Sequence, residues 1–167
     1  MDGGGGAPIS GKELILKMAD QKGRYTEAQK RSAEKYLQEK VEEYFAQMAA
    51  DIRKAKENAD FVIFFPHIGG QFNTRVGKFS ERVTELAIEA GADAVVASHS
   101  HVVQRAEYRD GIPCAYSLGN FSMSPDFYAV EAKHLREYGL AAHLYLDDAK
   151  GEKVTVSFLK GVYTRGE

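Results

Sequence analysis

Three histidines, each following a predicted strand, are the residues with the clearest chemical potential. His67 comes directly after the apolar run 61–65, and His99 and His101 follow the run 93–97. Ligands in α/β folds gather at the carboxyl ends of parallel strands, so we expect the three rings to lie within reach of one ion. In an extended chain residues two apart point the same way, which would aim His99 and His101 at one site. Imidazole nitrogen suits Zn, Fe, Mn or Ni. The alternative is that all three are polar loop histidines bonded to backbone carbonyls.

The remaining candidates lack such a setting. His134 lies in a charged stretch, and His143 lies inside a predicted strand, where a surface or half-buried position is expected. Cys114 falls within a hairpin strand and is expected to be a small core residue rather than a nucleophile. Ser117 has no evident base and no Gly-x-Ser-x-Gly elbow around it.

The first third of the chain predicts a lead and one long helix. Residues 1–24 are expected to form a flexible Gly-rich lead with a weak helix over 12–24. Thr26 and Gln29 have the spacing of a capping box, which opens a charged helix running to about residue 58. We expect it to pack on a sheet and overhang it, a coiled-coil partner being the alternative. Its predicted apolar face comprises Leu37, Val41, Tyr44, Phe45, Met48, Ile52 and Ala55.

The following elements predict a mixed α/β sandwich. The five large apolar residues 61–65 favour a central strand buried on both faces. A helix over about 79–90, with Gly91 as a left-handed cap, then leads to a strand at 93–97, which implies a parallel crossover. Two hairpins are expected next, over 102–116 around Asp110-Gly111 and over 140–163. Parallel strands followed by hairpins indicate a mixed sheet or a two-sheet sandwich.

Composition excludes several classes of function. The 167 residues carry 22 Lys and Arg against 24 Asp and Glu, a net charge of −2, so we expect no nucleic-acid partner. We predict no membrane helix and no signal peptide, because the chain lacks a long apolar run and a charged, then apolar, N-terminus. The single cysteine leaves the compartment open.

Three segments resemble the C-terminal half of CapA-type (PGA_cap) poly-γ-glutamate capsule synthesis proteins. They are Ala59–Ile63 with Pro66–Phe72, then Ala90–Gln104 around the His-x-His pair, and finally Tyr116–Phe121, which reads YSLGNF. The resemblance covers roughly residues 48–163. YSLGNF at this distance from His-x-His is the most specific of them.

The resemblance implies a fold and a kind of site. The fold would be the calcineurin-like metallophosphatase α/β sandwich, here an incomplete C-terminal half with a long N-terminal helix. His67, His99 and His101 match metal ligands of that superfamily's two-metal centre, which polarises a phosphoryl oxygen. Nothing before His67 supplies the superfamily's aspartates and asparagine. We therefore expect at most one divalent ion (Mn, Fe or Zn) in this chain.

Departures from the family pattern concern the residues around the histidines. Gln71 stands where the family has an acidic residue, so a catalytic role for His67 or Gln71 is not assured. Ser98 replaces a glycine, and Ser100 replaces a proline. Candidates for supporting the ligands are Ser98, Asn120 and Glu107, the last being the nearest carboxylate for a general base in a complete three-histidine zinc hydrolase.

These expectations define one leading function and one alternative. Residues 25–167 would form the C-terminal domain of a capsule synthesis protein, with a partial metal site and no catalysis alone. The missing N-terminal half, or a second copy pairing with an open sheet edge, would be its partner. The family implies the cell envelope or extracellular face. The alternative is a non-enzymatic binding or structural module that self-associates.

Overall fold

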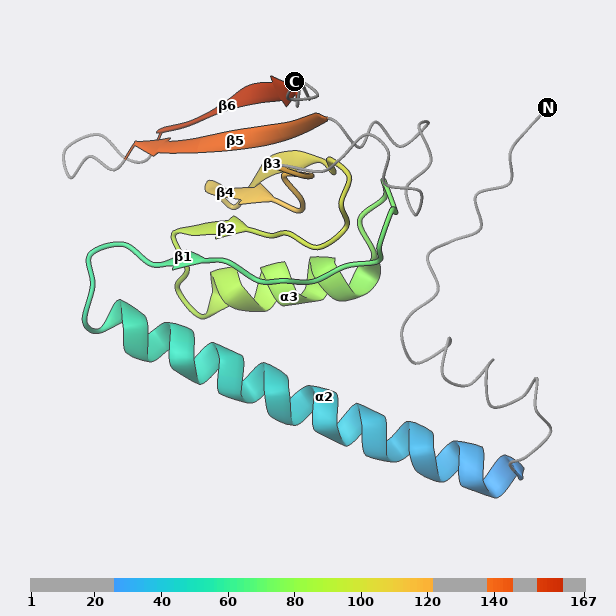
Figure 1. The fold of residues 1–167 in the computed structure, drawn as a ribbon. Coiled ribbons are helices and arrows are strands. Elements are labelled where there is room, and N and C mark those ends of the chain that lie inside the picture. The colour runs from blue at the N-terminus through green and yellow to red at the C-terminus, as the bar shows by residue number, and fades with distance from the viewer. Residues whose placement is uncertain (1–25, 122–137, 146–152, 161–167) are drawn as a thin grey trace, which may run out of the picture.

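Two helices, a four-stranded mixed sheet and a two-stranded hairpin form three stacked layers in the described part of the computed structural model (Figure 1). The structure describes residues 26–121, 138–145 and 153–160. The expected lead and weak helix over 1–24 lie outside the described residues. The mixture of parallel and antiparallel strands confirms the predicted α/β class.

The long helix α2 (Glu27–Lys56) begins at the predicted capping box. Thr26 Oγ1 accepts a hydrogen bond from the Gln29 backbone N–H at 3.3 Å, and the Thr26 N–H donates to Gln29 Oε1 at 2.8 Å. These two bonds satisfy backbone donors that a helix N-terminus otherwise leaves unpaired. The helix ends one residue before Glu57, with three basic residues in its last turn.

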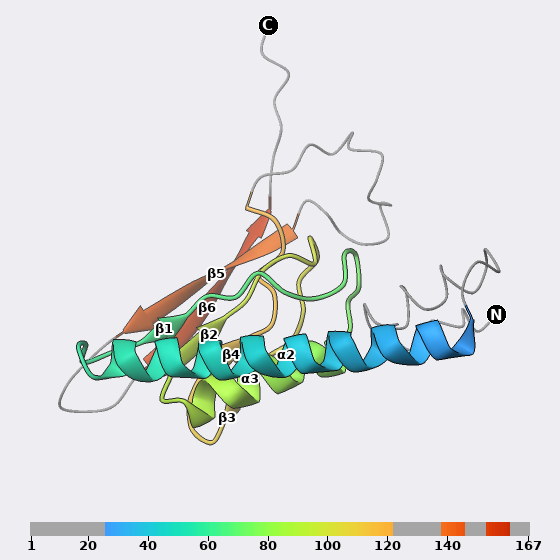
Figure 2. The ribbon, with the colours of Figure 1, turned by 90° about the horizontal axis from the view of Figure 1, so that it is seen from below.

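Only the C-terminal part of α2 packs into the core. Ala49 and Ile52 are its buried residues, in a cluster with Val62 and Ala87. The predicted apolar face is wrong at Tyr44, whose exposure is 70%, and at Ala55, which is also exposed. Figure 2 shows the N-terminal part of α2 reaching past α3, so the predicted overhang is confirmed. The coiled-coil alternative stays a prediction.

The central sheet has the strand order β1-β2-β4-β3. Strand β1 (Ile63–Phe64) is followed by helix α3 (Lys78–Glu89) and strand β2 (Ala94–Val96), and β1 and β2 pair in parallel. Strand β4 (Ile112–Ala115) pairs in parallel with β2 and antiparallel with β3 (Ala106–Arg109). The predicted parallel crossover is confirmed. Gly91 has a φ of +103° after α3, as expected of a left-handed cap.

The prediction that residues 61–65 form a central, doubly buried strand is wrong. Only Ile63 and Phe64 are in β1, and among the described residues this strand pairs with β2 alone. Val62 is buried beneath the helices, whereas Ile63 is 45% and Phe65 is 62% exposed. Because alternate residues of a strand face opposite sides, one side of β1 packs on the helices and the other lies uncovered.

Both predicted hairpins are present. The turn between β3 and β4 is made by Asp110 and Gly111, whose φ values of +51° and +82° fit the mirror-image turn that tight hairpins prefer. Strand β5 (Tyr138–Tyr145) pairs antiparallel with β6 (Lys153–Lys160) along its whole length. This second hairpin forms the layer opposite the helices (Figure 1).

One ion pair fixes the starts of the two parallel strands. Lys56 Nζ, at the end of α2, lies 2.7 Å from each oxygen of Asp93, just before β2. The same carboxylate accepts a hydrogen bond from the Val62 N–H at 2.7 Å, just before β1. The contact therefore aligns β1 with β2 and sets where their far ends meet. Within the described ranges, no helix is long and apolar enough to cross a membrane.

Candidate functional site

The far ends of β1 and β2 bring His67 and His99 together. Parallel pairing continues past both strands as a bridge between His67 and Ser98, with the Ile68 N–H donating to the Ser98 carbonyl at 2.9 Å. His67 Nε2 consequently lies 2.8 Å from His99 Nδ1, and the ring centroids are 4.5 Å apart at an interplanar angle of 69°. Two imidazole nitrogens thus converge at the carboxyl ends of adjacent parallel strands.

The His-x-His segment is not extended, so that part of the prediction is wrong. His99 has a φ of +127° and His101 a φ of +58°. The chain turns sharply around Ser100, whose side chain is fully buried and donates to the Val102 carbonyl at 2.9 Å. The His99 and His101 ring centroids are 6.4 Å apart. A strained turn, rather than strand alternation, places both rings at this end of the sheet.

His101 is held by a residue from the YSLGNF segment. Its Nδ1 lies 2.8 Å from Asn120 Oδ1, and Asn120 Nδ2 donates to the His101 backbone carbonyl at 2.8 Å. The Phe72 ring lies beside it, with centroids 5.7 Å apart. Asn120 therefore contacts both the ring and the backbone of one candidate ligand.

Electrostatics keep His99 neutral more readily than an ordinary histidine. Partial burial, and then the neighbouring His67 and His101, lower its pKa from the usual 6.5, because each disfavours the charged imidazolium. A neutral ring has a lone pair to offer. Ser98 Oγ lies 3.3 Å from His67 Nδ1, so the other ring of the pair is supported on its far side.

The cluster fits a metal ion only in part. Two nitrogens bound to one ion at about 2.1 Å would lie roughly 3.0–3.4 Å apart, so His67 and His99 need to separate only slightly. Among the described residues, no group of three or more His, Cys, Asp or Glu side chains is placed to hold an ion. Imidazole nitrogens are donors of a kind that borderline divalent metals accept, and the described residues by themselves do not complete a ligand set.

Two further predicted site residues, Gln71 and Glu107, do not take part in the contact between His67 and His99. Gln71 is exposed in the loop that follows His67. Glu107, on β3, accepts a hydrogen bond from the Tyr116 hydroxyl at 3.1 Å and pairs with Arg105 at 3.3 Å. Those partners account for Glu107 as part of a structural network around the buried Tyr116 ring. Glu107 therefore contacts Tyr116 and Arg105, and these contacts do not place it beside the histidines as a general base.

The other predicted residues behave as side chains of the framework. Cys114 is buried, and desolvation raises the pKa of its thiol to about 11, which suppresses the reactive thiolate. His143 is exposed on β5 and lies 2.9 Å from Ser157 Oγ, as expected for a surface residue. His134 lies outside the described residues.

Two glycines that allow close backbone packing beside the site were not predicted from the sequence. Gly119 has a φ of +74°, and a Cβ there would lie 3.0 Å from both the Tyr138 carbonyl and Val103 Cγ2. At Gly139, a Cβ would lie only 2.3 Å from the Asn120 carbonyl oxygen. Gly139 lies just before the hairpin predicted over 140–163, whereas the structure places it inside β5. A glycine within a strand is a signal of close backbone approach, so the early start of β5 hid this signal.

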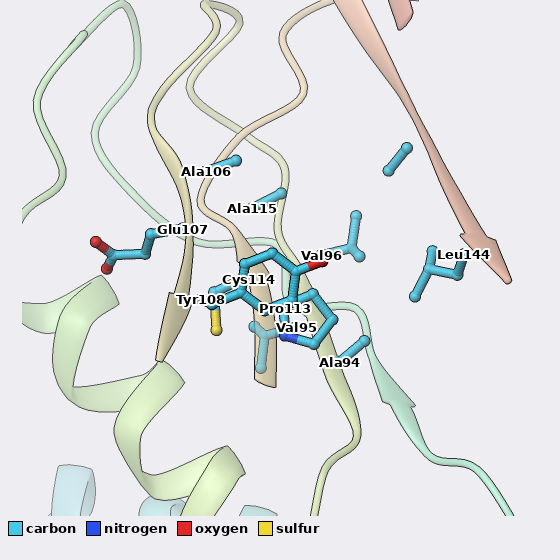
Figure 3. Close-up of a pocket in the computed structure, with 11 residues that line it drawn as sticks. Ala94, Val95, Val96, Ala106, Glu107, Tyr108, Pro113, Cys114, Ala115 and Leu144 are labelled. Atoms are coloured by element: carbon cyan, nitrogen blue, oxygen red, sulfur yellow. The ribbon is translucent and has the colours of Figure 1, made fainter. Parts of the chain in front are cut away.

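A cavity of about 210 Å³ lies elsewhere, between the central sheet and β5. Figure 3 shows its lining of mostly aliphatic side chains, including Val96, Ala115 and Leu144, with the Glu107 carboxylate turned away from them. No histidine lines it. This cavity is an apolar gap between layers, and its lining includes two predicted candidates, Glu107 and Cys114, whose contacts and burial are described above.

The fold and the site define a class: a mixed α/β domain that clusters histidines at the carboxyl ends of adjacent parallel strands. The family model described as "Bacterial capsule synthesis protein PGA_cap" matches residues 9–124. The chain therefore belongs to the PGA_cap family of bacterial capsule synthesis proteins. The match includes the histidines and Asn120, and it begins within the predicted lead.

Curated relatives agree with this family. The Capsule biosynthesis protein CapA of Bacillus anthracis is 35% identical over a 100-residue alignment that covers 54% of this chain and 24% of that protein. The PGA biosynthesis protein CapA of Bacillus subtilis (strain 168) is 30% identical over 89 residues, 53% of this chain and 23% of that protein. The uncharacterized protein y4sH of Sinorhizobium fredii is 33% identical over 78 residues, 46% and 17% respectively. The matched region spans a quarter or less of these relatives.

Proposed function

We propose that this chain is the C-terminal part of a CapA-type protein of capsule or poly-γ-glutamate synthesis, and that it contributes a partial metal site to a metallophosphatase-like hydrolase. The observation that carries the proposal is the 2.8 Å approach of His67 Nε2 and His99 Nδ1 at the ends of two parallel strands. The family match and the CapA relatives supply the biological setting.

His67, His99 and His101 would be the ligands to one divalent ion, the first two converging most closely. Such an ion supplies Lewis-acid chemistry for hydrolysis of a phosphoester. Within the described residues, what this chain adds is orientation: Ser98 supports the His67 ring, and the loop around Ser100 holds His99 and His101 at the same end of the sheet. The lowered pKa of His99 leaves its ring neutral for a cation.

The remaining ligands would come from the rest of the protein or from a second copy. Strand β1 pairs with β2 alone in the described part, and exposed Ile63 and Phe65 lie on its uncovered side. The backbone at an open edge is suited to pairing with a further strand, and a layer that continued beyond this edge would cover the exposed face of β1. The short coverage of the relatives agrees with a larger parent protein. We infer that carboxylate ligands complete the centre across this edge, in the calcineurin-like arrangement.

Metal binding by the purified chain tests the proposal. Protein prepared without chelator is dialysed against Zn²⁺ or Mn²⁺, and bound metal is measured by elemental analysis. We expect weak binding of one ion per chain and a loss of at least about tenfold in affinity for His67→Ala and His99→Ala, because each variant removes a ligand. His143→Ala is the matched control, since His143 contacts Ser157 on the second hairpin.

The outcomes distinguish the proposal from its alternative. An absence of bound metal in the unaltered chain, or equal binding by His67→Ala, would contradict a metal role. Full phosphatase activity of the chain alone, abolished in His99→Ala, would contradict the incomplete site. The incomplete ligand set among the described residues favours the second candidate, a non-enzymatic module that self-associates. Dimerisation without metal binding would support that candidate.

A further inference from the structure

We propose that Asn120 is a positioning residue that holds His101 in one tautomer, with the proton on Nδ1 and the lone pair on Nε2. The His101 Nδ1 and Asn120 Oδ1 atoms are 2.8 Å apart. An amide oxygen can only accept, so the imidazole nitrogen facing it must donate. The other ring nitrogen, Nε2, is thereby presented as a lone pair to an electrophile, either a divalent cation or a proton of a substrate.

The direction of the Asn120 amide is fixed by a second bond. Asn120 Nδ2 donates to the His101 backbone carbonyl at 2.8 Å. Turning the amide over would set its oxygen against that carbonyl oxygen, two acceptors without a proton between them. One orientation therefore satisfies both contacts, and the tautomer of His101 follows from it.

Close backbone packing delivers Asn120 to this position. Leu118 bridges Val103, and the Leu140 N–H donates to the Leu118 carbonyl at 2.7 Å. Gly119 and Gly139 face each other in a further bridge, where side chains at either position would clash with neighbouring backbone. The segment before Asn120 is thus held between the loop after His101 and the start of β5.

The same contact supports the strained backbone of His101. A φ of +58° is uncommon for a residue other than glycine. The hydrogen bond from Asn120 Nδ2 binds the carbonyl of that residue, so the amide secures both the main chain and the ring. A purely structural asparagine would need only the backbone contact. The additional bond to the ring nitrogen is what indicates a role in presenting Nε2.

Nuclear magnetic resonance of the full chain, labelled with ¹⁵N in its histidines, tests the tautomer directly. Two-bond couplings between ring protons and nitrogens distinguish Nδ1–H from Nε2–H imidazole at about pH 8.5, roughly two units above an ordinary histidine pKa. We expect His101 to show the Nδ1–H pattern. Asn120→Ala should shift it toward Nε2–H, while Asn120→Asp, which keeps an acceptor, should retain Nδ1–H.

Ser117→Ala is the matched control for a general loosening of the segment. Ser117 is buried and its Oγ accepts from the Gly119 N–H at 3.2 Å, so the variant removes a bond from the same segment without touching His101. It should leave the tautomer unchanged. An Nε2–H pattern in the unaltered chain, or an equal shift in Ser117→Ala, would overturn the proposal. The unaltered chain decides the question even if Asn120→Ala fails to fold.

A metal titration separates this inference from the proposed function. If Zn²⁺ binds near His101, Asn120→Ala should weaken binding by roughly 10–100-fold, the usual effect of removing a group that orients a ligand, and Ser117→Ala should not. The tautomer result does not require that Zn²⁺ binds at all. Metal binding together with an Nε2–H tautomer of His101 would overturn only the inference about Asn120. An Nδ1–H tautomer without metal binding would overturn only the metal site.

Discussion

The histidine cluster contains two differently supported parts. His67 and His99 contact each other through ring nitrogens 2.8 Å apart, and either ring can donate in such a bond. His101 instead contacts an amide whose direction is set by a second bond, so only one tautomer fits. The proton between His67 and His99 can lie on either ring, so this contact is adjustable, and in the proposed function the two rings would separate around an ion. The His101–Asn120 contact has a fixed direction. The difference shows that one site can combine an adjustable part with a rigid one.

The largest expected effect comes from a substitution that pushes Asn120 away from His101. Gly139→Ala would place a Cβ 2.3 Å from the Asn120 carbonyl oxygen, a backbone atom that cannot rotate away. We expect the free energy of unfolding to fall by about 3 kcal/mol, at the upper end for overpacking, with Asn120 displaced from His101. Urea denaturation measures the loss.

Gly70→Ala is the control for Gly139→Ala. A Cβ at Gly70 would meet only the Asn73 side chain, at 3.7 Å, which is ordinary contact. This variant should change the free energy of unfolding by less than about 1 kcal/mol. Equal losses in both variants would contradict the importance of the close approach at Gly139.

The adjustable part stores backbone strain at His99. With a φ of +127°, any residue with a Cβ is strained there. His99→Ala removes the ring and keeps the strain, while His99→Gly removes both, so the glycine variant should be more stable than the alanine variant by about 1–2 kcal/mol. Thermal unfolding of the two proteins checks the sign. Greater stability of His99→Ala would refute strain at this position.

The smallest expected effect is a pH dependence of the stability, which arises from His99 in its contact with His67. Because the pKa of His99 is lowered on folding, the unfolded chain binds its proton more readily than the folded chain does. Stability contributed by neutral His99 is therefore present above its ordinary pKa of 6.5 and is lost as the pH falls below it. Denaturation midpoints measured between about pH 5 and 8 should slope less in His99→Ala than in the unaltered chain.

His143→Ala supplies the reference for that slope. His143 lies on β5 and contacts Ser157, outside the histidine cluster. Its replacement should leave the slope unchanged. If the denaturation midpoint of His99→Ala varies with pH as steeply as that of the unaltered chain, the pH dependence comes from other groups.

Local chemistry was readable from the sequence. Thr26 and Gln29 predicted the helix start, and Asp110 with Gly111 predicted a hairpin turn, because caps and tight turns depend on a few adjacent residues. The approach of His67 to the His99 segment was also predictable. Parallel strands joined by one helix bring their carboxyl ends together whatever lies around them.

The burial of β1 could not be predicted from its composition. Residues 61–65 are all apolar, which normally indicates a strand covered on both faces. Whether such a strand is covered depends on which segments lie beside it, and in the described structure Ile63 and Phe65 are exposed at an edge. Tyr44 was misplaced for a similar reason, since α2 extends beyond the surface on which it packs (Figure 2).

The sequence by itself determined which residues are chemically able to act: three imidazoles after two strands, and the motif that contains Asn120. Only the tertiary structure decided how they pair. His101 and Asn120 are 19 residues apart, and the glycines that let Asn120 approach belong to two segments with no regular spacing. Hydrogen-bond direction, left-handed backbone at His99 and His101, and close approach of backbones arise from packing between distant segments, which no local pattern specifies.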